Sequence, residues 1–152
     1  MLPLLEELKT TLEQLLPGVA LSVEGGILFV DAKDLITVCR CLKDNERFGL
    51  DYLANLTAVD YPPDRMDVVY HLYSMAHKHG PLVLKVKLPR ATPTAASVTP
   101  IWRGAEFQER EVYDLYGVTF DGHPDLRRIL MWDGFAGHPM RKDYVVEDQD
   151  AE

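Results

Sequence analysis

The sequence predicts an α+β fold, in which helices pack on one face of a mostly antiparallel sheet and are followed by a further helix and a long irregular C-terminal arm. Helical and β-rich runs alternate over the first 90 residues, and short gaps separate the later β-rich runs. After residue 117 no regular periodicity follows. We therefore divide the chain into an α/β sandwich domain (1–90), a connector with its helix (91–117) and an arm (118–152).

A helix and a hairpin open the predicted sandwich domain. Leucines recur at helical spacing through residues 2–16, which predicts an amphipathic helix. Two short β-rich runs then flank Gly25-Gly26, a pair typical of a hairpin turn. Residues 31–45 predict a second helix, with Asp31 as its N-cap. These segments supply the helical layer and the first strand pair.

Three extended runs follow, over residues 52–61, 66–75 and 81–89. Each is apolar and rich in β-branched or aromatic residues, and turn residues fill the gaps between them. Because the gaps are short, the runs should pair as an antiparallel meander. In the third run Lys85 and Lys87 alternate with apolar residues, so one face of this strand should be in contact with water.

The last third of the chain differs in residue composition from the first 90 residues. Residues 91–104 are small and polar and contain prolines, as expected of a connector. Residues 105–116 predict a helix, with Gly117 as its C-cap. The arm has no predicted element but is rich in large apolar side chains, which disordered chains lack, so we expect it to be ordered by packing on a partner protein. These side chains are Phe120, Leu126, Ile129, Leu130, Met131, Trp132, Phe135 and Tyr144.

Charge and composition exclude several classes of function. The net charge of −8 argues against a general nucleic-acid role, which needs a basic field. No stretch approaches the roughly 20 apolar residues that span a bilayer, so any membrane link must go through a partner or the surface. Cys39 and Cys41 cannot form a disulfide framework, and no second pair is present to hold zinc or an iron–sulfur cluster. We expect reduced cysteines in a cytosolic protein.

The predicted helix 105–116 carries an unusual set of charges. Glu106, Arg110 and Asp114 are four residues apart and are expected to form a ladder of ion pairs on the helix surface. Glu109 instead lies among apolar helical neighbours, where a bare carboxylate would cost several kcal/mol. It therefore needs a partner. The candidate cations are Arg127, Arg128, Arg141 and Lys142.

Acid–base catalysis by Glu109, Asp114 and His123 is the alternative, because these residue types suit it. However, the sequence has no nucleophile motif, no glycine-rich phosphate loop and no metal-ligand spacing. His123 and His138 each lie in a Gly-His-Pro half-repeat, and a metal would need another pair of ligands. A structural or docking role is therefore favoured over catalysis or metal binding.

The segment EREVYDLYGVTFDGHPDLRRIL (109–130) fills every position of a known signature. The filled positions are Glu109-Arg110-Glu111, Asp114, Leu115-Tyr116, His123, Arg127 and Ile129-Leu130. By these residues the chain resembles the 30 kDa subunit family of respiratory complex I, the NADH-quinone oxidoreductase. The run GFAGHPMRKDY, which contains His138, Arg141, Lys142 and Asp143, also resembles the family, as does the upstream SVTPIWRGAEFQ.

The resemblance implies a non-catalytic peripheral-arm subunit on the cytoplasmic side of the cell membrane, within a proton-translocating complex. Family members carry no cofactor of their own, since NADH, FMN, iron–sulfur clusters and quinone belong to other subunits. The implied partners are the large hydrogenase-like subunit, around which the arm wraps, and a cluster-bearing small subunit. The chain would associate with the membrane through these partner subunits only. The charged residues of the signature, together with Arg128, would bind helix 105–116 to the arm and help both to bind the large subunit. Related hydrogenases and complexes with other donors use the same module, so the electron donor stays open.

Overall fold

The structure is a computed structural model that describes residues 4–145. The start of the predicted first helix and the end of the predicted arm, residues 1–3 and 146–152, lie outside the described residues. Three α-helices are present within the described range: α1 (Leu5–Leu15), α2 (Leu35–Asp44) and α3 (Ala105–Tyr116), with a short 3-10 turn, η1 (Ala32–Asp34), ahead of α2. The strands are β1 (Leu21–Glu24), β2 (Ile27–Val30), β3 (Tyr52–Tyr61), β4 (Arg65–Ser74), β5 (His79–Pro89), β6 (Thr94–Ala96) and β7 (Thr119–Asp121).

Five strands form the main sheet in the order β1-β2-β5-β4-β3. The predicted hairpin and meander are both present, and every neighbouring pair is antiparallel except β2 and β5. These two strands pair in parallel, with Leu28 opposite Leu84, which joins the hairpin to the meander in one sheet. The predicted α+β class with a mostly antiparallel sheet is therefore confirmed.

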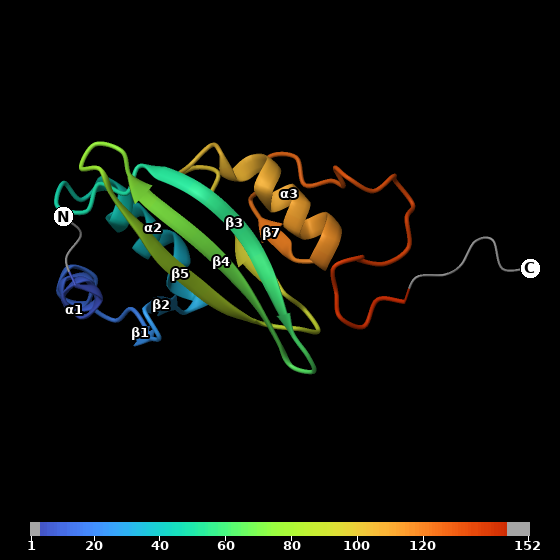
Figure 1. Cartoon of the computed structure of the whole chain (residues 1–152), viewed down its shortest axis with the longest axis horizontal. Helices are drawn as coiled ribbons and strands as arrows, with labels where there is room; N and C mark the ends of the chain where they lie inside the picture. Colours follow the sequence, from blue (N-terminus) through green and yellow to red (C-terminus); the bar gives the residue numbers. More distant parts are fainter. Residues whose placement is uncertain (1–3, 146–152) are drawn as a thin grey trace, which may run out of the picture.

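The hydrophobic core lies on one face of this sheet. Alternate residues of β4, such as Val68 and Tyr70, are fully buried there, as the two-residue period of a strand requires. Leu8 of α1, Leu42 of α2 and Val112 of α3 belong to the same buried cluster. Figure 1 shows α2 behind the sheet and α3 beside the strand β3. The helices thus cover one face and leave the other open.

Two local predictions need correction. The connector and the beginning of the arm are not wholly irregular, because β6 and β7 pair in parallel, with Ala95 opposite Phe120. Both side chains are buried in the core, which explains why two three-residue segments form a ladder that is too short for periodicity to reveal. Asp31 does cap a helical turn, but its carboxylate accepts from Lys33 N in η1, and α2 begins later, at Leu35.

Candidate functional site

The helix α3 and the arm form the candidate site, because nearly all the predicted site residues lie on them. Figure 1 shows the arm as a wide loop that follows β7 and extends away from the sheet. The helix ends at Tyr116 as predicted, and Gly117 adopts a left-handed conformation (φ 79°) and donates its N–H to Tyr113 O. The arm therefore starts from a sharply defined helix end.

Asp114 is the centre of the contacts between α3 and the arm. Its buried Oδ2 accepts hydrogen bonds from the backbone N–H groups of Ile129 (3.2 Å), Leu130 (2.7 Å) and Met131 (2.9 Å). Its Oδ1 accepts from Arg128 Nη1 at 2.9 Å. One carboxylate thus fixes four consecutive residues of the arm.

These contacts also keep Asp114 ionised. Burial by itself would raise the pKa of this carboxyl, but the three backbone donors and the Arg128 guanidinium together hold the pKa below its ordinary value. Arg128 is shared in turn, since its Nη2 donates to Gly137 O at 2.9 Å and its guanidinium lies 5.6 Å from the centre of the Phe135 ring. Arg128 thereby links α3 to two separate parts of the arm.

Arg110 supports the same stretch of the arm from one turn earlier in α3. Its Nε donates to the backbone oxygen of Arg127 and its Nη2 to that of Arg128, each at 3.1 Å. Because Arg110 is buried and bonds carbonyls instead of a carboxylate, its charge is neutralised by no direct ion pair among the described residues. A lysine could not make this forked contact.

The second Gly-His-Pro half-repeat closes the C-terminal end of α3. The last carbonyls of a helix lack partners within the helix, and here the arm supplies them. His138 Nδ1–H donates to Asp114 O (3.0 Å), Met140 N–H to Leu115 O (2.9 Å) and Arg141 Nε to Tyr116 O (2.6 Å). Placing Arg141 at this negative end of the helix dipole is also favourable.

The first half-repeat contacts the same helix two turns earlier. His123 Nδ1 accepts the N–H of Asp125, so Nε2 carries the proton and donates to Glu106 O at 2.9 Å. Both nitrogens of His123 are therefore occupied in its neutral form. The two half-repeats place one histidine each on the backbone of α3.

Glu109 faces the other way, toward the connector. Its Oε1 accepts from Ser97 Oγ at 2.5 Å and its Oε2 from Val98 N at 3.1 Å, within a fully buried environment. Burial raises its pKa from 4.5 to about 7, although the two hydrogen bonds partly oppose that shift. Glu109 thus fastens the connector to α3 and lies poised between its charged and neutral forms near neutral pH.

The end of the arm returns to the sheet. Asp60 of β3 accepts two hydrogen bonds from Arg90, at 2.6 and 3.0 Å, and one from Lys142 N at 2.9 Å. The Arg90 guanidinium holds the pKa of Asp60 below its ordinary value. Arg90 also pairs with Asp143 at 3.1 Å. The arm is therefore fixed at both ends, by α3 and by the sheet.

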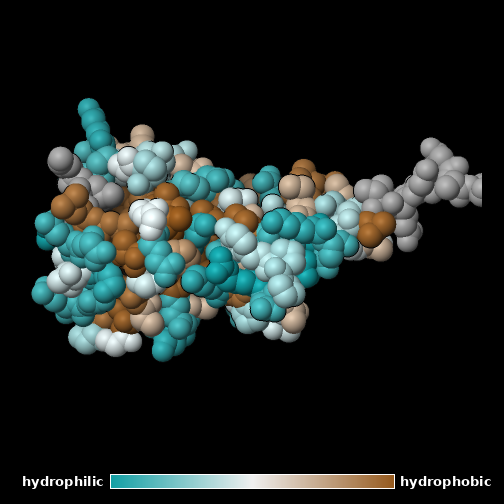
Figure 2. All heavy atoms as spheres, turned by 60° about the horizontal axis from the view of Figure 1, so that its bottom comes forward, coloured by the Kyte–Doolittle hydropathy of each residue, from teal (hydrophilic) through white to brown (hydrophobic). Residues whose placement is uncertain are grey.

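Some of the large apolar side chains of the arm point away from the molecule. Leu130, Trp132 and Met140 are 57%, 62% and 53% exposed, and Phe107 on α3 is 58% exposed. Trp132 packs edge-on against Phe135, with ring centres 4.8 Å apart. Figure 2 shows apolar residues gathered over the body of the molecule, whereas isolated apolar residues stand among polar ones on the arm. The arm thus presents separate apolar side chains to the outside.

The structure corrects two predictions about these charges. Among the described residues no ion pair joins Glu106, Arg110 and Asp114, so the surface ladder is wrong, and the latter two are buried because the arm covers them. Glu109 is buried as expected, but its partners are the neutral Ser97 and Val98 and not a cation of the arm. Helical spacing could not reveal partners that lie in another segment.

The structure gathers most of the predicted site residues at the boundary between α3 and the arm. These are Arg110, Asp114, Arg128, His123, His138 and Arg141, with Lys142 and Asp143 at the return to the sheet. Glu111 is exposed, and Arg127 pairs only with its neighbour Asp125 on the surface. Sequence reasoning missed Ser97, Asp60 and Arg90. A signal for Asp60 was available, because it is the one charged residue of a strand rich in apolar residues.

Glu109, Asp114 and His123, the candidate catalytic set, have separate partners and do not form a common cluster of hydrogen bonds. Within residues 4–145, no group of three or more His, Cys, Asp or Glu side chains is arranged to hold a metal ion. None of the helices that the structure describes is long and apolar enough to cross a membrane.

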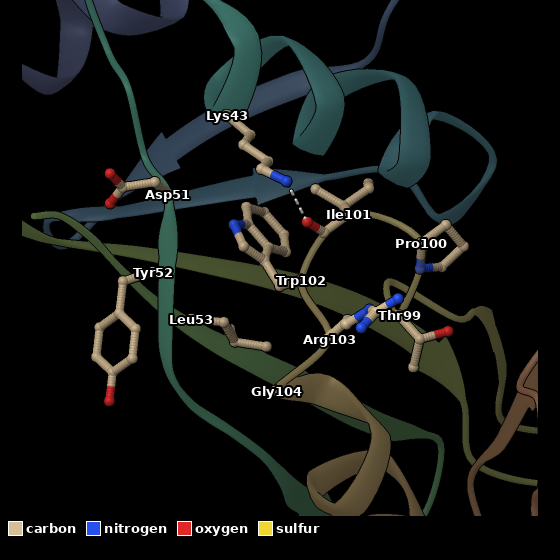
Figure 3. A pocket seen from close by; sticks show the side chains of 10 residues that line it. All are labelled: Lys43, Asp51, Tyr52, Leu53, Thr99, Pro100, Ile101, Trp102, Arg103 and Gly104. Atoms are coloured by element: carbon tan, nitrogen blue, oxygen red, sulfur yellow. Dashed lines mark hydrogen bonds between the residues drawn. The ribbon is translucent and has the colours of Figure 1, made fainter. Parts of the chain in front are cut away.

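A pocket of about 580 Å³ lies elsewhere, between α2, the start of β3 and the loop 99–104 (Figure 3). Two of its polar groups are engaged in the fold, since Lys43 Nζ donates to Ile101 O at 2.7 Å and Trp102 Nε1 to Leu50 O at 3.0 Å. The pocket contains none of the predicted site residues. The boundary between α3 and the arm therefore remains the candidate site.

Comparison with known sequences gives a consistent family. The profile described as "Respiratory-chain NADH dehydrogenase, 30 Kd subunit" matches residues 28–150. An NADH-quinone oxidoreductase subunit of Moorella thermoacetica is 44% identical over 146 residues, which cover 93% of this chain and 95% of the relative. The corresponding NADH-quinone oxidoreductase subunit of Caulobacter vibrioides is 46% identical over 135 residues, covering 86% of this chain and 68% of the relative.

Solved structures agree with this family. A chain of the membrane-bound sulfane sulfur reductase, an archaeal respiratory membrane complex, aligns with a TM-score of 0.74 over 97% of this chain and 98% of that chain, and its 23% identity shows the shared fold alone. The trypsin-resistant fragment (1-134) of Nqo5 aligns with a TM-score of 0.53 and 31% identity, over 78% of this chain and 98% of that chain. The profile match and the 44% identity to a relative of nearly the same length show that the chain belongs to the family of the 30 kDa subunit of the respiratory-chain NADH dehydrogenase.

Proposed function

We propose that the chain is a non-catalytic peripheral-arm subunit of a proton-translocating NADH-quinone oxidoreductase. In this proposal it supports assembly of the large, hydrogenase-like subunit at the quinone site and lies near a cluster-bearing small subunit. It contributes to electron transfer from NADH to quinone only through this support, because NADH, FMN, iron–sulfur clusters and quinone are bound by other subunits. Its partners hold it at the cytoplasmic side of the membrane.

The observation that carries the proposal is the contrast within the arm. Several of its polar groups turn inward, where Asp114, Arg110 and the C-terminal carbonyls of α3 bind them. Three of its large apolar side chains, Leu130, Trp132 and Met140, turn outward, and Trp132 is 62% exposed. Exposed aromatic and apolar residues on a segment held in one conformation are typical of an interface, because such a segment loses little entropy on binding. This arrangement favours a surface prepared for a partner protein.

The engagement of the candidate catalytic groups supports a non-catalytic role. Asp114 already accepts four hydrogen bonds, and both ring nitrogens of His123 are used by the backbone. Glu109 is enclosed by the connector. A general acid or base must reach the proton it transfers, which these contacts prevent without a rearrangement of the arm.

The relatives favour NADH as the donor. The two relatives compared above, at 44% and 46% identity, are both named as subunits of NADH-quinone oxidoreductase. The likeness to the sulfane sulfur reductase is in fold, at a lower identity of 23%. We therefore propose NADH-quinone oxidoreductase ahead of a hydrogenase or a complex with another donor.

The test replaces the outward apolar side chains. In the double variant Leu130→Ser/Trp132→Ser, we expect the amount of assembled complex in the membrane to fall several-fold, with a parallel loss of NADH:quinone activity. The matched control is Leu15→Ser/Met75→Ser, in which two side chains of similar exposure, 49% and 64%, are changed far from the arm. Native gels of solubilised membranes measure the assembled complex. Normal assembly of the arm variant would refute the docking role of this surface.

A further inference from the structure

The face of the sheet that the helices leave open carries a cluster of basic residues. Strand register places Lys87 beside Asp67 and Lys85 beside Val69, with side chains on this face. Neither lysine forms an ion pair within residues 4–145. Because the chain as a whole has a net charge of −8, cations gathered on one face are a departure from its average surface.

Aromatic rings hold these cations in place. The Tyr61 ring centre lies 4.4 Å from the Arg65 guanidinium carbon, 5.9 Å from Lys85 Nζ and 5.9 Å from Lys142 Nζ. On the neighbouring strand, Lys87 Nζ lies 4.6 Å from the centre of the Phe29 ring. A cation that rests on an aromatic face loses mobility before any ligand arrives. We call the set Phe29, Tyr61, Arg65, Lys85, Lys87 and Lys142 the basic sheet face.

One carboxylate lies among these cations. Asp67 is fully buried between them, and its Oδ1 lies 2.9 Å from Arg65 Nε, but neither of its oxygens accepts a hydrogen bond from the described residues. Asp67 can neutralise one of the four positive charges. The remaining charges have no partner within 4 Å in the part of the chain that the structure describes, so the face is electrostatically incomplete.

We infer that the basic sheet face is a second docking surface, which binds an acidic segment of a partner protein. A sheet face whose cations rest on aromatic rings complements the carboxylates of a glutamate- or aspartate-rich segment. A lipid surface fits less well, because Phe29 lies beneath Lys87 and no side chain of the face is among the large apolar residues that are freely exposed. The inference does not rest on the proposed function, since the arm uses apolar side chains and this face uses charges.

The experiment titrates the isotope-labelled full chain with a deca-glutamate peptide and follows the backbone amides of β3, β4 and β5 by NMR. A deca-glutamine peptide and phosphatidylglycerol vesicles are titrated in parallel. The test variant is Lys85→Gln/Lys87→Gln, which removes two charges but keeps most of each side chain. The control is Lys33→Gln/Arg40→Gln, which removes the same charge from exposed positions of η1 and α2. Lys142→Gln, outside the sheet, is a second test variant whose fold does not depend on β5.

We expect deca-glutamate to shift amides around Tyr61 and Arg65, with an affinity that falls with added salt. Affinity should drop about tenfold in Lys85→Gln/Lys87→Gln, less in Lys142→Gln and not in the control. Equal binding by test and control variants would overturn the inference, and so would an absence of shifts on this face. Binding of the vesicles through Lys85 and Lys87 in place of the peptide would also overturn it, by assigning the face to anionic lipid.

Discussion

The carboxylate of Asp114 in α3 lies 2.9 Å from the guanidinium of Arg128 in the arm, and the two side chains are only 0% and 15% exposed. This ion pair is reinforced by three backbone N–H groups that converge on the same carboxylate. The helix therefore determines the course of the arm. A partner that binds the arm is connected to α3 through these hydrogen bonds. Disturbing this pair should loosen the arm without unfolding the sheet.

Replacing Asp114 with asparagine should release the arm from α3. The amide keeps the shape but has one acceptor oxygen and no charge, so its NH₂ group must face either Arg128 or the backbone N–H groups of residues 129–131, and the donors that it faces lose their acceptor. We expect a local loss of about 3 kcal/mol. Hydrogen exchange should accelerate at the amides of residues 129–131 and stay slow in the core of β4.

The control for this variant is Asp125→Asn. Asp125 pairs with Arg127 at 2.9 Å, but the two side chains are 50% and 66% exposed, so this change should cost less than about 1 kcal/mol. Equal exchange in the two variants would contradict a special role for Asp114. Because the pKa of Asp114 is held below its ordinary value of 3.8, its stabilising effect should be present at neutral pH and be lost only below that value.

Glu109 should make the free energy of unfolding fall as pH rises, whereas the contribution of Asp114 is lost as pH falls. Burial raises its folded-state pKa from 4.5 to about 7, so the fold binds a proton that the unfolded chain releases. The buried Glu109 carboxyl does not lower the free energy of unfolding below pH 4.5, where it is protonated in both states. Between pH 4.5 and about 7 the free energy of unfolding falls, and above about 7 the full loss is about 3 kcal/mol. Glu109→Gln, which mimics the protonated group, should abolish this decline. Urea unfolding of both proteins from pH 4.5 to 8 measures it.

The matched control for Glu109→Gln is Glu111→Gln on the exposed side of α3. This variant should follow the wild-type dependence of stability on pH, because its carboxyl group lies in water. If the free energies of unfolding of wild type and Glu109→Gln stay parallel from pH 4.5 to 8, then Glu109 does not take up a proton in the folded state.

The elements that follow local patterns could be predicted from the sequence. Helix α3 runs from Ala105 to Tyr116, as its periodicity predicts, and Gly117 ends it because a left-handed residue is needed there. The strands β3, β4 and β5 likewise coincide closely with the predicted runs. In these cases neighbouring residues alone determine the conformation, so a window of the sequence holds the necessary information.

The partners within the site could not be predicted in the same way. Arg110, His138 and Arg141 bond to backbone carbonyls, and every residue has a carbonyl, so composition contains no signal for the choice. Glu109 pairs with Ser97 because β6 and β7 bring the connector beside α3, a contact decided by two three-residue strands. Helical spacing identified the residues of the site but assigned Glu109 and Asp114 to the wrong neighbours.

Gly117→Ala should disturb the same site from the end of α3. A Cβ at this position would lie 2.7 Å from the ring of His138, and the backbone φ of 79° is itself unfavourable for alanine. We expect a loss of about 2–3 kcal/mol and faster exchange at the last turn of α3, as His138 leaves Asp114 O. Thermal unfolding and hydrogen exchange measure these effects.

Gly134→Ala separates the cost of the backbone conformation from the cost of the contact with His138. Gly134 also has a positive φ, 85°, but a Cβ there would meet no atom within 4 Å. This variant should show the conformational cost alone, about 1 kcal/mol, with normal exchange at the end of α3. A loss in Gly117→Ala no larger than that in Gly134→Ala would show that the contact with His138 does not stabilise the helix end.

Asp60→Asn should free the end of the arm where it returns to the sheet. The carboxylate now accepts from Arg90 and from Lys142 N, and an amide at this position would turn a donor toward one of them. Losing hydrogen bonds to a charged group costs about 2 kcal/mol, so the segment around Lys142 should open more often. This free energy corresponds to a factor of about 30, so trypsin should cleave there about thirtyfold faster. The control is Asp51→Asn, whose carboxylate accepts from Met75 N and has no contact with the arm. Equal cleavage rates after Lys142 in the two variants would show that Asp60 does not hold the arm, and that its pairing with Arg90 serves the sheet alone.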